Sequence, residues 1–337
     1  NTVFKKLLDI GDIIGIKGVV FTTKVGDISI KVKNLTKYYG DRLAVDDISF
    51  DVDQGEIVGF LGPNAAGKTT TMRILTGFLS PTRGEAWVAD YNVLSQSLEA
   101  RRRIGYFAES VPLYTDMTVR SYLDFLAKLR GLDKTRIKRR IEDVVGICHL
   151  EEYTDVLIGK LSRGFRQRVG VAQAIIHEPE VLILDEPTVG IDPIQVTMTR
   201  QLITDLGKER TVLLSTHILP EVSMTCQRVI IIHEGKIVAQ DSIENLSTAV
   251  SGGKRFRLEV EGPSKEVAER LRQLQGVRTV RYDGAQYTIE SSAGEDPRSR
   301  IMEAMVQSGW TLLSLESMEL SLEDIFLKLT TQEETAQ

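Results

Sequence analysis

The chain has few cysteines and no long hydrophobic run, and both absences restrict what it can be. Its 337 residues include only two cysteines, Cys148 and Cys226, with no short spacing between them and no histidine pattern around them. We therefore expect neither a disulfide framework nor a zinc site, and we interpret both as small apolar packing residues. No run of about 18 apolar residues occurs, so the sequence predicts no transmembrane helix.

An excess of basic residues is also missing. The formal net charge is −5, whereas dedicated nucleic-acid-binding proteins are usually strongly basic. The first 26 residues do not read as a secretion signal, because Lys17 and Lys24 interrupt them and no small-residue cleavage site follows an apolar core. We expect a soluble protein in a reducing cytoplasm, long enough to bury a sizeable core.

The hydrophobic patterns predict an α/β core. Short apolar stretches that read as strands lie at residues 28–32, 44–52, 56–61, 181–184, 212–215 and 229–233. The fully apolar ones suit the centre of a sheet covered on both faces. Apolar residues at helical spacing between residues 119 and 150 predict an inserted helical subdomain. Its many Lys and Arg residues most simply form a solvated face, with a specific anion site as the alternative.

Beyond about residue 247 the pattern changes. Strand signals at 256–260, 277–282, 286–290 and 310–316 alternate with helical signals at 264–274 and 297–307, and a short helix follows at 320–329. The order β-α-β-β-α-β is that of a ferredoxin-like domain, and it contains no catalytic cluster. We therefore predict an N-terminal extension at 1–26, a nucleotide-binding domain at 27–246 and a ferredoxin-like accessory domain at 247–337.

A complete phosphate-loop motif, G-x-x-x-x-G-K-[ST], follows the strand at 56–61 and precedes a helical stretch at 69–79. Backbone N–H groups and the start of the helix would form an anion cradle there. Lys68 adds a positive charge for the β- and γ-phosphates, and the Thr69 hydroxyl can ligate Mg²⁺. An ordinary glycine turn is the alternative. The residues expected to hold the nucleotide are Gly62, Pro63, Asn64, Ala65, Ala66, Gly67, Lys68, Thr69 and Thr70.

Two further strands end in polar residues. The strand at 181–184 is followed by Asp185 and Glu186, and a nearby dication is the natural reason to tolerate adjacent carboxylates. Asp185 is placed to hold Mg²⁺, and Glu186 to polarise an attacking water. His217 follows the strand at 212–215, where a structural histidine would be the default interpretation.

The stretch Leu-Ser-Arg-Gly-Phe-Arg-Gln-Arg at 161–168 resembles the signature motif of ABC transporter ATPase subunits. The resemblance covers residues 28–245, with the motifs in the family's order. It implies that two cassettes pack head to tail, as a homodimer or a heterodimer, with each ATP between one phosphate loop and the opposite signature motif. It also implies a membrane permease as partner, no nucleic acid, and a peripheral position on the inner face of the membrane.

The resemblance implies a role for several further residues. Tyr39 occupies the adenine-stacking position, and Ser162 and Gly164 would reach the γ-phosphate of the partner's ATP. Asp192 would cross the interface, and His217 would contact the γ-phosphate and orient the water. Glu186, His217 and Lys68 are thus the predicted catalytic residues, and ATP and Mg²⁺ the cofactors.

Four positions depart from the commonest family pattern. Arg163 replaces a glycine and Phe165 a glutamine of the signature motif, while Ser162 and Gly164 are kept. Glu109 stands where most members have glutamine, and we expect it to bind Mg²⁺ together with Thr69 and Asp185. Ala65 replaces a glycine, at a cost of about 1 kcal/mol if the position needs positive φ.

The departures point to one subgroup of the family. A glutamate at the position of Glu109 resembles the pattern of the multidrug, polysaccharide and gliding-motility exporters. The ending at 321–327 resembles the accessory domain of those proteins. We therefore expect the ATP-hydrolysing subunit of an exporter. The alternatives are a soluble ABC-type ATPase acting on the ribosome or DNA, and an RNA-binding protein built on residues 1–26. Neither a second cassette nor a long coiled coil is present, and the acidic balance argues against RNA binding.

Residues 1–26 do not fit the family pattern. Together with residues 27–30 they resemble a piece of the OB-fold anticodon-binding domain of class II lysyl-tRNA synthetases, but they are too short for such a barrel. We expect a junction between unrelated sequences near residues 26 and 27. An unusual N-terminal hairpin of a natural subunit is the alternative.

Overall fold

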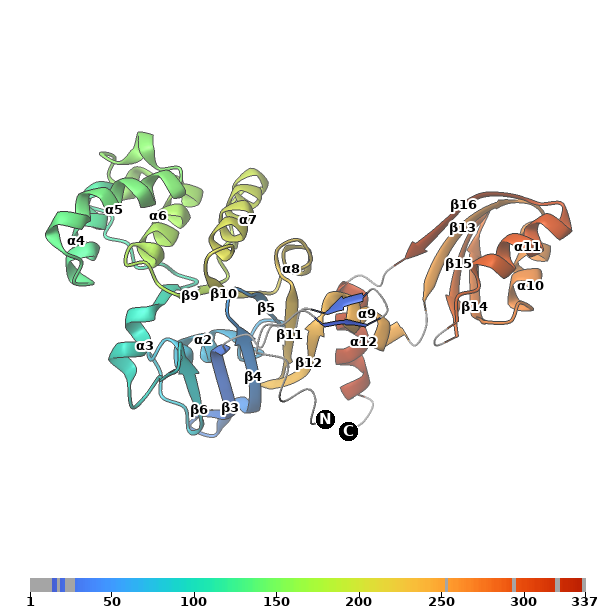
Figure 1. Cartoon of the computed structure of the whole chain (residues 1–337), viewed down its shortest axis with the longest axis horizontal. Coiled ribbons are helices and arrows are strands. Elements are labelled where there is room, and N and C mark those ends of the chain that lie inside the picture. The colour runs from blue at the N-terminus through green and yellow to red at the C-terminus, as the bar shows by residue number, and fades with distance from the viewer. Residues whose placement is uncertain are drawn as a thin grey trace.

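The structure of the chain is a computed structural model, viewed as a whole in Figure 1. It describes the backbone of residues 14–16, 19–21, 28–251, 254–292, 295–318 and 322–334. Most of the N-terminal extension, and with it the segment that resembles the synthetase fragment, lies outside these residues. Its described part is an antiparallel pair of short strands, β1 (Ile14–Ile16) and β2 (Val19–Phe21).

The centre of the molecule is a six-stranded sheet in the order β12-β11-β5-β10-β9-β8. All neighbours are parallel except β12, which runs antiparallel to β11. Every residue of β5, β9 and β10 is buried, which explains why the centre of each strand is apolar in sequence. The strands are β5 (Ile57–Leu61), β8 (Ile104–Phe107), β9 (Val181–Asp185), β10 (Thr211–Thr216), β11 (Arg228–His233) and β12 (Lys236–Ser242).

An antiparallel sheet and helix α2 (Lys68–Leu75) cover one face of the central sheet. The antiparallel sheet has the order β4-β3-β6-β7. Its strands are β3 (Ile28–Tyr39), β4 (Arg42–Asp53), β6 (Arg83–Val88) and β7 (Tyr91–Asn92). Side chains of β3 and β4 pack with Val58, Phe60 and Ile183 of the central sheet in one core. The α/β fold with an antiparallel subdomain is therefore confirmed.

Helix α2 ends earlier than the sequence pattern suggested. We expected helical spacing to continue to Leu79, but the helix stops at Leu75, and Gly77 adopts φ +68°. The N–H of Phe78 then donates to the Arg73 carbonyl, and that of Gly77 to Ile74, as in a glycine-terminated helix. The glycine ended the helix although apolar residues follow it.

Helices on the other face of the central sheet form the inserted subdomain and its support. These are α4 (Val119–Leu129), α5 (Lys134–Ile147), α6 (Arg163–Ile175) and α7 (Pro193–Gly207), joined by 3-10 turns at Glu151–Tyr153 and Ile158–Lys160. Helix α3 (Ser97–Arg103) precedes β8. Arg140 is an exception to the predicted solvated basic face: it is buried and donates to the carbonyls of Ile175 and Ile176 at the end of α6.

The C-terminal region forms a separate four-stranded antiparallel sheet, visible at one end of the molecule in Figure 1. The strand order β14-β15-β13-β16, with two helices, is the ferredoxin-like arrangement expected from the sequence. Phe256, Tyr287 and Ile301 belong to a core of its own. The elements are β13 (Arg255–Glu261), α10 (Ser264–Arg272), β14 (Val277–Asp283), β15 (Gln286–Ser291), α11 (Arg298–Ser308) and β16 (Thr311–Met318).

The final helix, α12 (Leu322–Glu334), leaves this sheet and packs against α8 (Leu219–Thr225) and α9 (Ile243–Ser251). Leu322 and Ile325 share a core with Leu61 and Val222 of the nucleotide-binding part. No sequence pattern predicted that α12 would pack against the nucleotide-binding part. The four-stranded unit therefore lies in the chain between two helices, α9 and α12, that contact each other.

Two predicted absences concern membranes and cysteines. Within the residues that the structure describes, no helix combines the length and apolarity needed to cross a bilayer. Cys148 and Cys226 are both free thiols, and each packs among apolar side chains. Burial raises the pKa of each thiol to about 12, which suits inert packing residues.

Candidate nucleotide-binding and catalytic site

The predicted site residues follow the carboxyl ends of neighbouring parallel strands. β10 lies between β5 and β9, so the phosphate loop after β5, Glu186 after β9 and His217 after β10 meet at one edge of the sheet. Glu109 follows β8, which pairs with β9. The parallel order of the strands thus gathers motifs that are far apart in the sequence.

These segments line one cleft of about 580 Å³. From the sequence we did not predict Arg42 or Ala44 as lining residues. Arg42 pairs with Tyr39 across the turn between β3 and β4, so its short distance from Tyr39 in the sequence was the available signal. Such a volume is suitable for a small-molecule ligand. The lining residues are Tyr39, Arg42, Ala44, Asn64, Ala65, Gly67, Lys68, Thr69, Thr70, Glu109, Glu186, Val189 and His217.

Close backbone approach explains the glycines of the phosphate loop. A Cβ on Gly62 would lie 2.3 Å from the Ile232 carbonyl oxygen, and one on Gly67 would lie 2.7 Å from that of Ala44. Gly67 also has φ +109° at the N-cap of α2. Only glycine fits these two positions without displacing backbone.

Ala65 occupies a left-handed backbone conformation with φ +67°. From the sequence we expected an energetic cost for alanine at this position if the position had positive φ. The structure shows that it does, so the cost applies. An L-residue there costs about 1–2 kcal/mol relative to the right-handed region. The loop keeps its form because the surrounding backbone imposes it.

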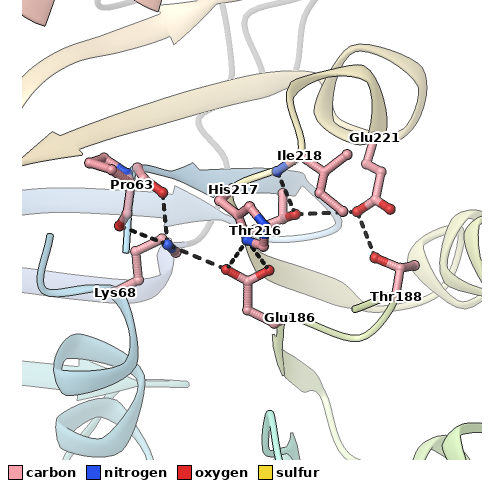
Figure 2. Close-up of polar contacts among 9 residues, drawn as sticks. Pro63, Lys68, Glu186, Thr188, Thr216, His217, Ile218 and Glu221 are labelled. Carbon is pink, nitrogen blue, oxygen red and sulfur yellow. Dashed lines mark hydrogen bonds and ion pairs between the residues drawn. The ribbon is translucent and has the colours of Figure 1, made fainter. Parts of the chain in front are cut away.

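Figure 2 shows Glu186 between Lys68 and His217, with its carboxylate in contact with both. Its carboxylate lies 3.3 Å from Nζ of Lys68 and 2.9 Å from Nδ1 of His217. Lys68 also donates to the carbonyls of Gly62 and Pro63, at 2.7 and 3.1 Å. The Glu186 side chain is only 7% exposed, so both contacts act in a partly desolvated setting. Lys68 and His217, two of the predicted catalytic residues, therefore both contact the third, Glu186.

The donors expected to hold a metal ion lie at the same edge. Asp185 is fully buried, and burial raises its pKa although the hydroxyls of Ser215 and Thr69 beside it act in the opposite direction. A buried carboxylate of this kind fits a cation ligand. The described residues contain no group of three acidic, His or Cys side chains able to hold an ion alone. This set fits Mg²⁺, which is commonly shared between one or two protein groups and substrate phosphates.

Six predicted nucleotide ligands do not line the cleft: Gly62, Pro63 and Ala66 belong to the phosphate loop beside it, whereas Ser162, Gly164 and Asp192 lie elsewhere. Ser162 caps α6 by accepting from the N–H of Phe165, and Asp192 caps α7 by accepting from Ile194 and Gln195. Gly164 lies against α7, since a Cβ there would come within 2.7 Å of the Gln195 side chain. The fold brings these residues to two adjacent helix starts, away from the chain's own phosphate loop.

Arg163 contacts a glycine of the loop between β9 and α7. A Cβ on Gly190 would lie 2.3 to 2.6 Å from guanidinium atoms of Arg163, and Gly190 has φ +73°. The arginine that replaces the usual glycine of the signature motif is thus accommodated by a residue without a side chain. No sequence signal linked the two positions.

Comparison with known proteins identifies the family. The family described as "ABC transporter" matches residues 45–189, and the C-terminal domain of DrrA1-3-like ATP-binding proteins matches residues 243–330. The bacitracin transport ATP-binding protein BcrA of Bacillus licheniformis is 38% identical over 302 residues, 89% of this chain and 96% of that protein. The chain is an ABC transporter ATP-binding protein.

Other relatives of this ABC protein are similar along most of the chain. The linearmycin resistance ATP-binding protein LnrL of Bacillus subtilis (strain 168) is 32% identical over 305 residues, 89% of this chain and 98% of that protein. Among solved structures, cbiO1 from Clostridium perfringens, part of the ABC transporter complex cbiONQ, has a TM-score of 0.61 at 26% identity, over 73% of this chain and 95% of that chain.

The membership determines the activity. The protein binds and hydrolyses ATP as the energy-supplying subunit of an ABC transporter. Both family matches lie beyond residue 44, so neither bears on residues 1–26. The resemblance of that segment to a synthetase fragment stays a prediction.

Proposed function

We propose that this subunit powers export through a separate membrane permease. The main support is the contact of Lys68, Glu186 and His217 at the phosphate-loop cleft, in a chain whose full-length relatives are named for bacitracin transport and linearmycin resistance. The C-terminal match to DrrA1-3-like proteins supports the same subgroup. The transported compound would be selected by the permease.

We propose the roles at the site from its geometry together with the roles that the family resemblance implies. Glu186 is the general base that accepts a proton from the attacking water, and His217 holds its carboxylate and contacts the γ-phosphate. Lys68 pairs with Glu186 in the structure, and phosphate would compete for its ammonium group, leaving Glu186 available to the water. Tyr39 would stack on adenine.

Thr69, Asp185 and Glu109 are the groups that would hold Mg²⁺. The ion would neutralise charge on the β- and γ-phosphates. The fully buried Asp185 carboxylate, which lies beside the Thr69 hydroxyl, carries this assignment. Thr69 and Glu109 line the cleft beside it.

A second copy or a related subunit would complete the site. Ser162, Gly164 and Asp192 lie at two adjacent helix starts outside the chain's own cleft, so they are available to a nucleotide held by a partner. A helix start favours a phosphate group electrostatically. We therefore propose a head-to-tail dimer closed by two ATP molecules.

An exposed apolar surface is the proposed permease contact. Arg101 of α3 lies beside Gly77 and accepts, at its carbonyl, a hydrogen bond from Arg130 at the end of α4, so these elements adjoin one another. Large apolar side chains are exposed along them, as expected of a protein interface. These are Phe78, Leu94, Leu98, Tyr114, Phe125 and Leu129. Docking there would place the protein peripherally at the membrane.

The decisive test removes the proposed base. Glu186→Gln keeps the shape of the side chain but not its basicity, so we expect turnover to fall by about 100-fold or more and ATP to hold the dimer closed. Size-exclusion chromatography with ATP and Mg²⁺ would show the dimer, and wild-type turnover would contradict the assignment.

Co-purification with a polytopic membrane protein, lost on Leu98→Asp, would test the export role separately.

A further inference from the structure

Behind the catalytic residues lies a buried carboxylate to which the proposed mechanism gives no role. Glu221 of α8 is 3% exposed. Its Oε2 accepts hydrogen bonds from the hydroxyls of Thr188, at 2.7 Å, and Thr216, at 3.2 Å. Figure 2 shows the side chain reaching both residues from α8.

The two threonines belong to the segments that carry the catalytic residues. Thr216 directly precedes His217, and its hydroxyl accepts from the N–H of Ile218 while donating to Glu221. The carboxylate therefore orients the hydroxyl that closes the turn around His217. Thr188 lies two residues after Glu186. One oxygen atom thus joins the loop after β9 to the turn after β10.

Helix α8, which carries this carboxylate, is tightly packed against its neighbours. The next residue, Val222, is fully buried and lies so close to β5 that a Cβ on Gly59 would be 2.7 Å from its Cγ1. Val222 also packs with Leu322 and Ile325 of α12. Glu221 is consequently presented from a rigid support, which is how side chains that position a site are usually held.

Burying the Glu221 carboxylate costs free energy that a purely stabilising role would not explain. Within the described part of the chain, Oε1 of Glu221 is buried and accepts no hydrogen bond. Burying a carboxylate with one satisfied oxygen costs more than burying a neutral or apolar side chain of similar size. A stability role alone would not require an acid here, whereas two hydroxyl donors that must be held together require a strong acceptor.

We propose that Glu221 is a positioning residue for ATP hydrolysis. Through Thr216 and Thr188 it fixes the His217 turn relative to the Glu186 loop, so that the imidazole and the carboxylate meet at hydrogen-bond distance before water attacks the γ-phosphate. This inference rests on the proposed roles of Glu186 and His217.

The first test compares substitutions at Glu221 in the full chain. Glu221→Ala removes the acceptor, so kcat should fall about 10- to 100-fold, because small displacements of catalytic groups have effects of that size. The KM for ATP and the Kd of a fluorescent ATP analogue should change by less than about twofold, since the nucleotide contacts are untouched. Glu221→Gln keeps one acceptor oxygen and should restore kcat to within about threefold.

Matched variants separate positioning from folding. Thr216→Val and Thr188→Val preserve shape but remove one hydroxyl each, and each should lower kcat by about three- to tenfold with unchanged nucleotide binding. Ser223→Ala changes an exposed residue of the same helix and should have no effect. Wild-type kcat in both threonine variants would overturn the proposal, even if Glu221→Ala did not fold.

A double-mutant cycle tests whether Glu221 acts through His217. In a His217→Ala background, Glu221→Ala should lower kcat by less than about twofold further, because the group that it positions is gone. An undiminished loss would mean a general structural effect and would refute the inference. If instead Glu186→Gln and His217→Ala themselves turned over like wild type, the proposed site roles would fail, whatever Glu221 does.

Discussion

At the scale of single residues, the site contains two non-glycine residues in the left-handed region. Ala65 has φ +67° and Glu186 has φ +52°. Each such conformation costs about 1–2 kcal/mol and persists only where the surrounding structure imposes it. At Glu186 the N–H donates to the Ser215 carbonyl, and the side chain is held by Lys68 and His217. Two of the chain's strained backbone positions thus lie in the phosphate loop and at the proposed base.

Ala65→Gly should relieve part of this strain. Glycine adopts positive φ freely, but it loses about 0.5–1 kcal/mol more conformational entropy on folding, so the net gain should be below about 1 kcal/mol. We expect a slightly higher melting temperature and up to about fivefold tighter ATP binding. Thermal unfolding and titration with a fluorescent nucleotide would measure both.

The neighbouring alanine is the matched control. Ala66 is buried and is not among the residues with positive φ, so Ala66→Gly gains nothing from backbone freedom and loses packing. It should destabilise the protein by about 1 kcal/mol. Equal effects of the two substitutions would show that strain at Ala65 is not the relevant term.

Lys68→Ala should abolish ATP binding while the fold remains. The ammonium group is 5% exposed and contacts Gly62, Pro63 and Glu186, so its loss removes the only side-chain cation predicted for the β- and γ-phosphates. Loss of a charge-assisted phosphate contact should weaken binding at least about 100-fold. Equilibrium binding measures this, with circular dichroism as the folding control. Tight binding by the variant would remove Lys68 from the site.

At the scale of elements, Glu290 ties three strands of the C-terminal sheet. From β15 it accepts from Arg255 of β13 and from Arg278 and Thr279 of β14. Burial raises its pKa, but the hydrogen bonds from these partners outweigh that effect and lower it to about 2. Because the folded-state pKa is depressed, the stabilisation is complete above the ordinary value of 4.5 and is lost as the pH falls from there towards 2.

The pH dependence of Glu290→Gln should follow from that sign. The variant should be less stable than wild type at about pH 6. The difference should shrink by about pH 3, because the carboxylate of the unfolded wild-type chain, with its ordinary pKa of 4.5, is protonated there. Urea unfolding of a Trp87→Phe background would report on this sheet through Trp310, which packs against its core. A difference that did not vary with pH would mean that charge is not involved.

At the scale of the whole molecule, α12 connects the C-terminal region to the nucleotide-binding part by packing against it. Ile325 is fully buried with Leu61, Val222 and Val229. The four-stranded unit is attached at both ends, through α9 and α12, to elements that pack together. Removing α12 would expose an apolar patch beside β5, the strand that leads into the phosphate loop.

Ile325→Ala should therefore destabilise the nucleotide-binding part rather than the four-stranded unit. Truncating a buried isoleucine costs about 2–5 kcal/mol. In a Trp310→Phe background, Trp87 should report a lower urea midpoint, whereas Trp310 in a Trp87→Phe background should not. Leu327→Ala, at a position 61% exposed, is the control and should change stability by less than about 0.5 kcal/mol.

The sequence by itself determined the features that depend on local chain order. The phosphate loop is continuous in sequence, the buried strands have apolar centres, and the C-terminal alternation of strands and helices is periodic, so each could be predicted and was found. The meeting of Lys68, Glu186 and His217 followed from parallel strands whose carboxyl ends share an edge.

Only the tertiary structure decided the features that depend on long-range packing. Gly77 ended α2 early, Arg140 turned inward to cap α6, and α12 joined the core beside β5 rather than its own sheet. The hydrogen bonds of Glu221 were equally invisible, because no sequence spacing links it to Thr188. The sequence determines the chemical character of each residue, but the residues that it contacts depend on which surfaces the whole chain buries together.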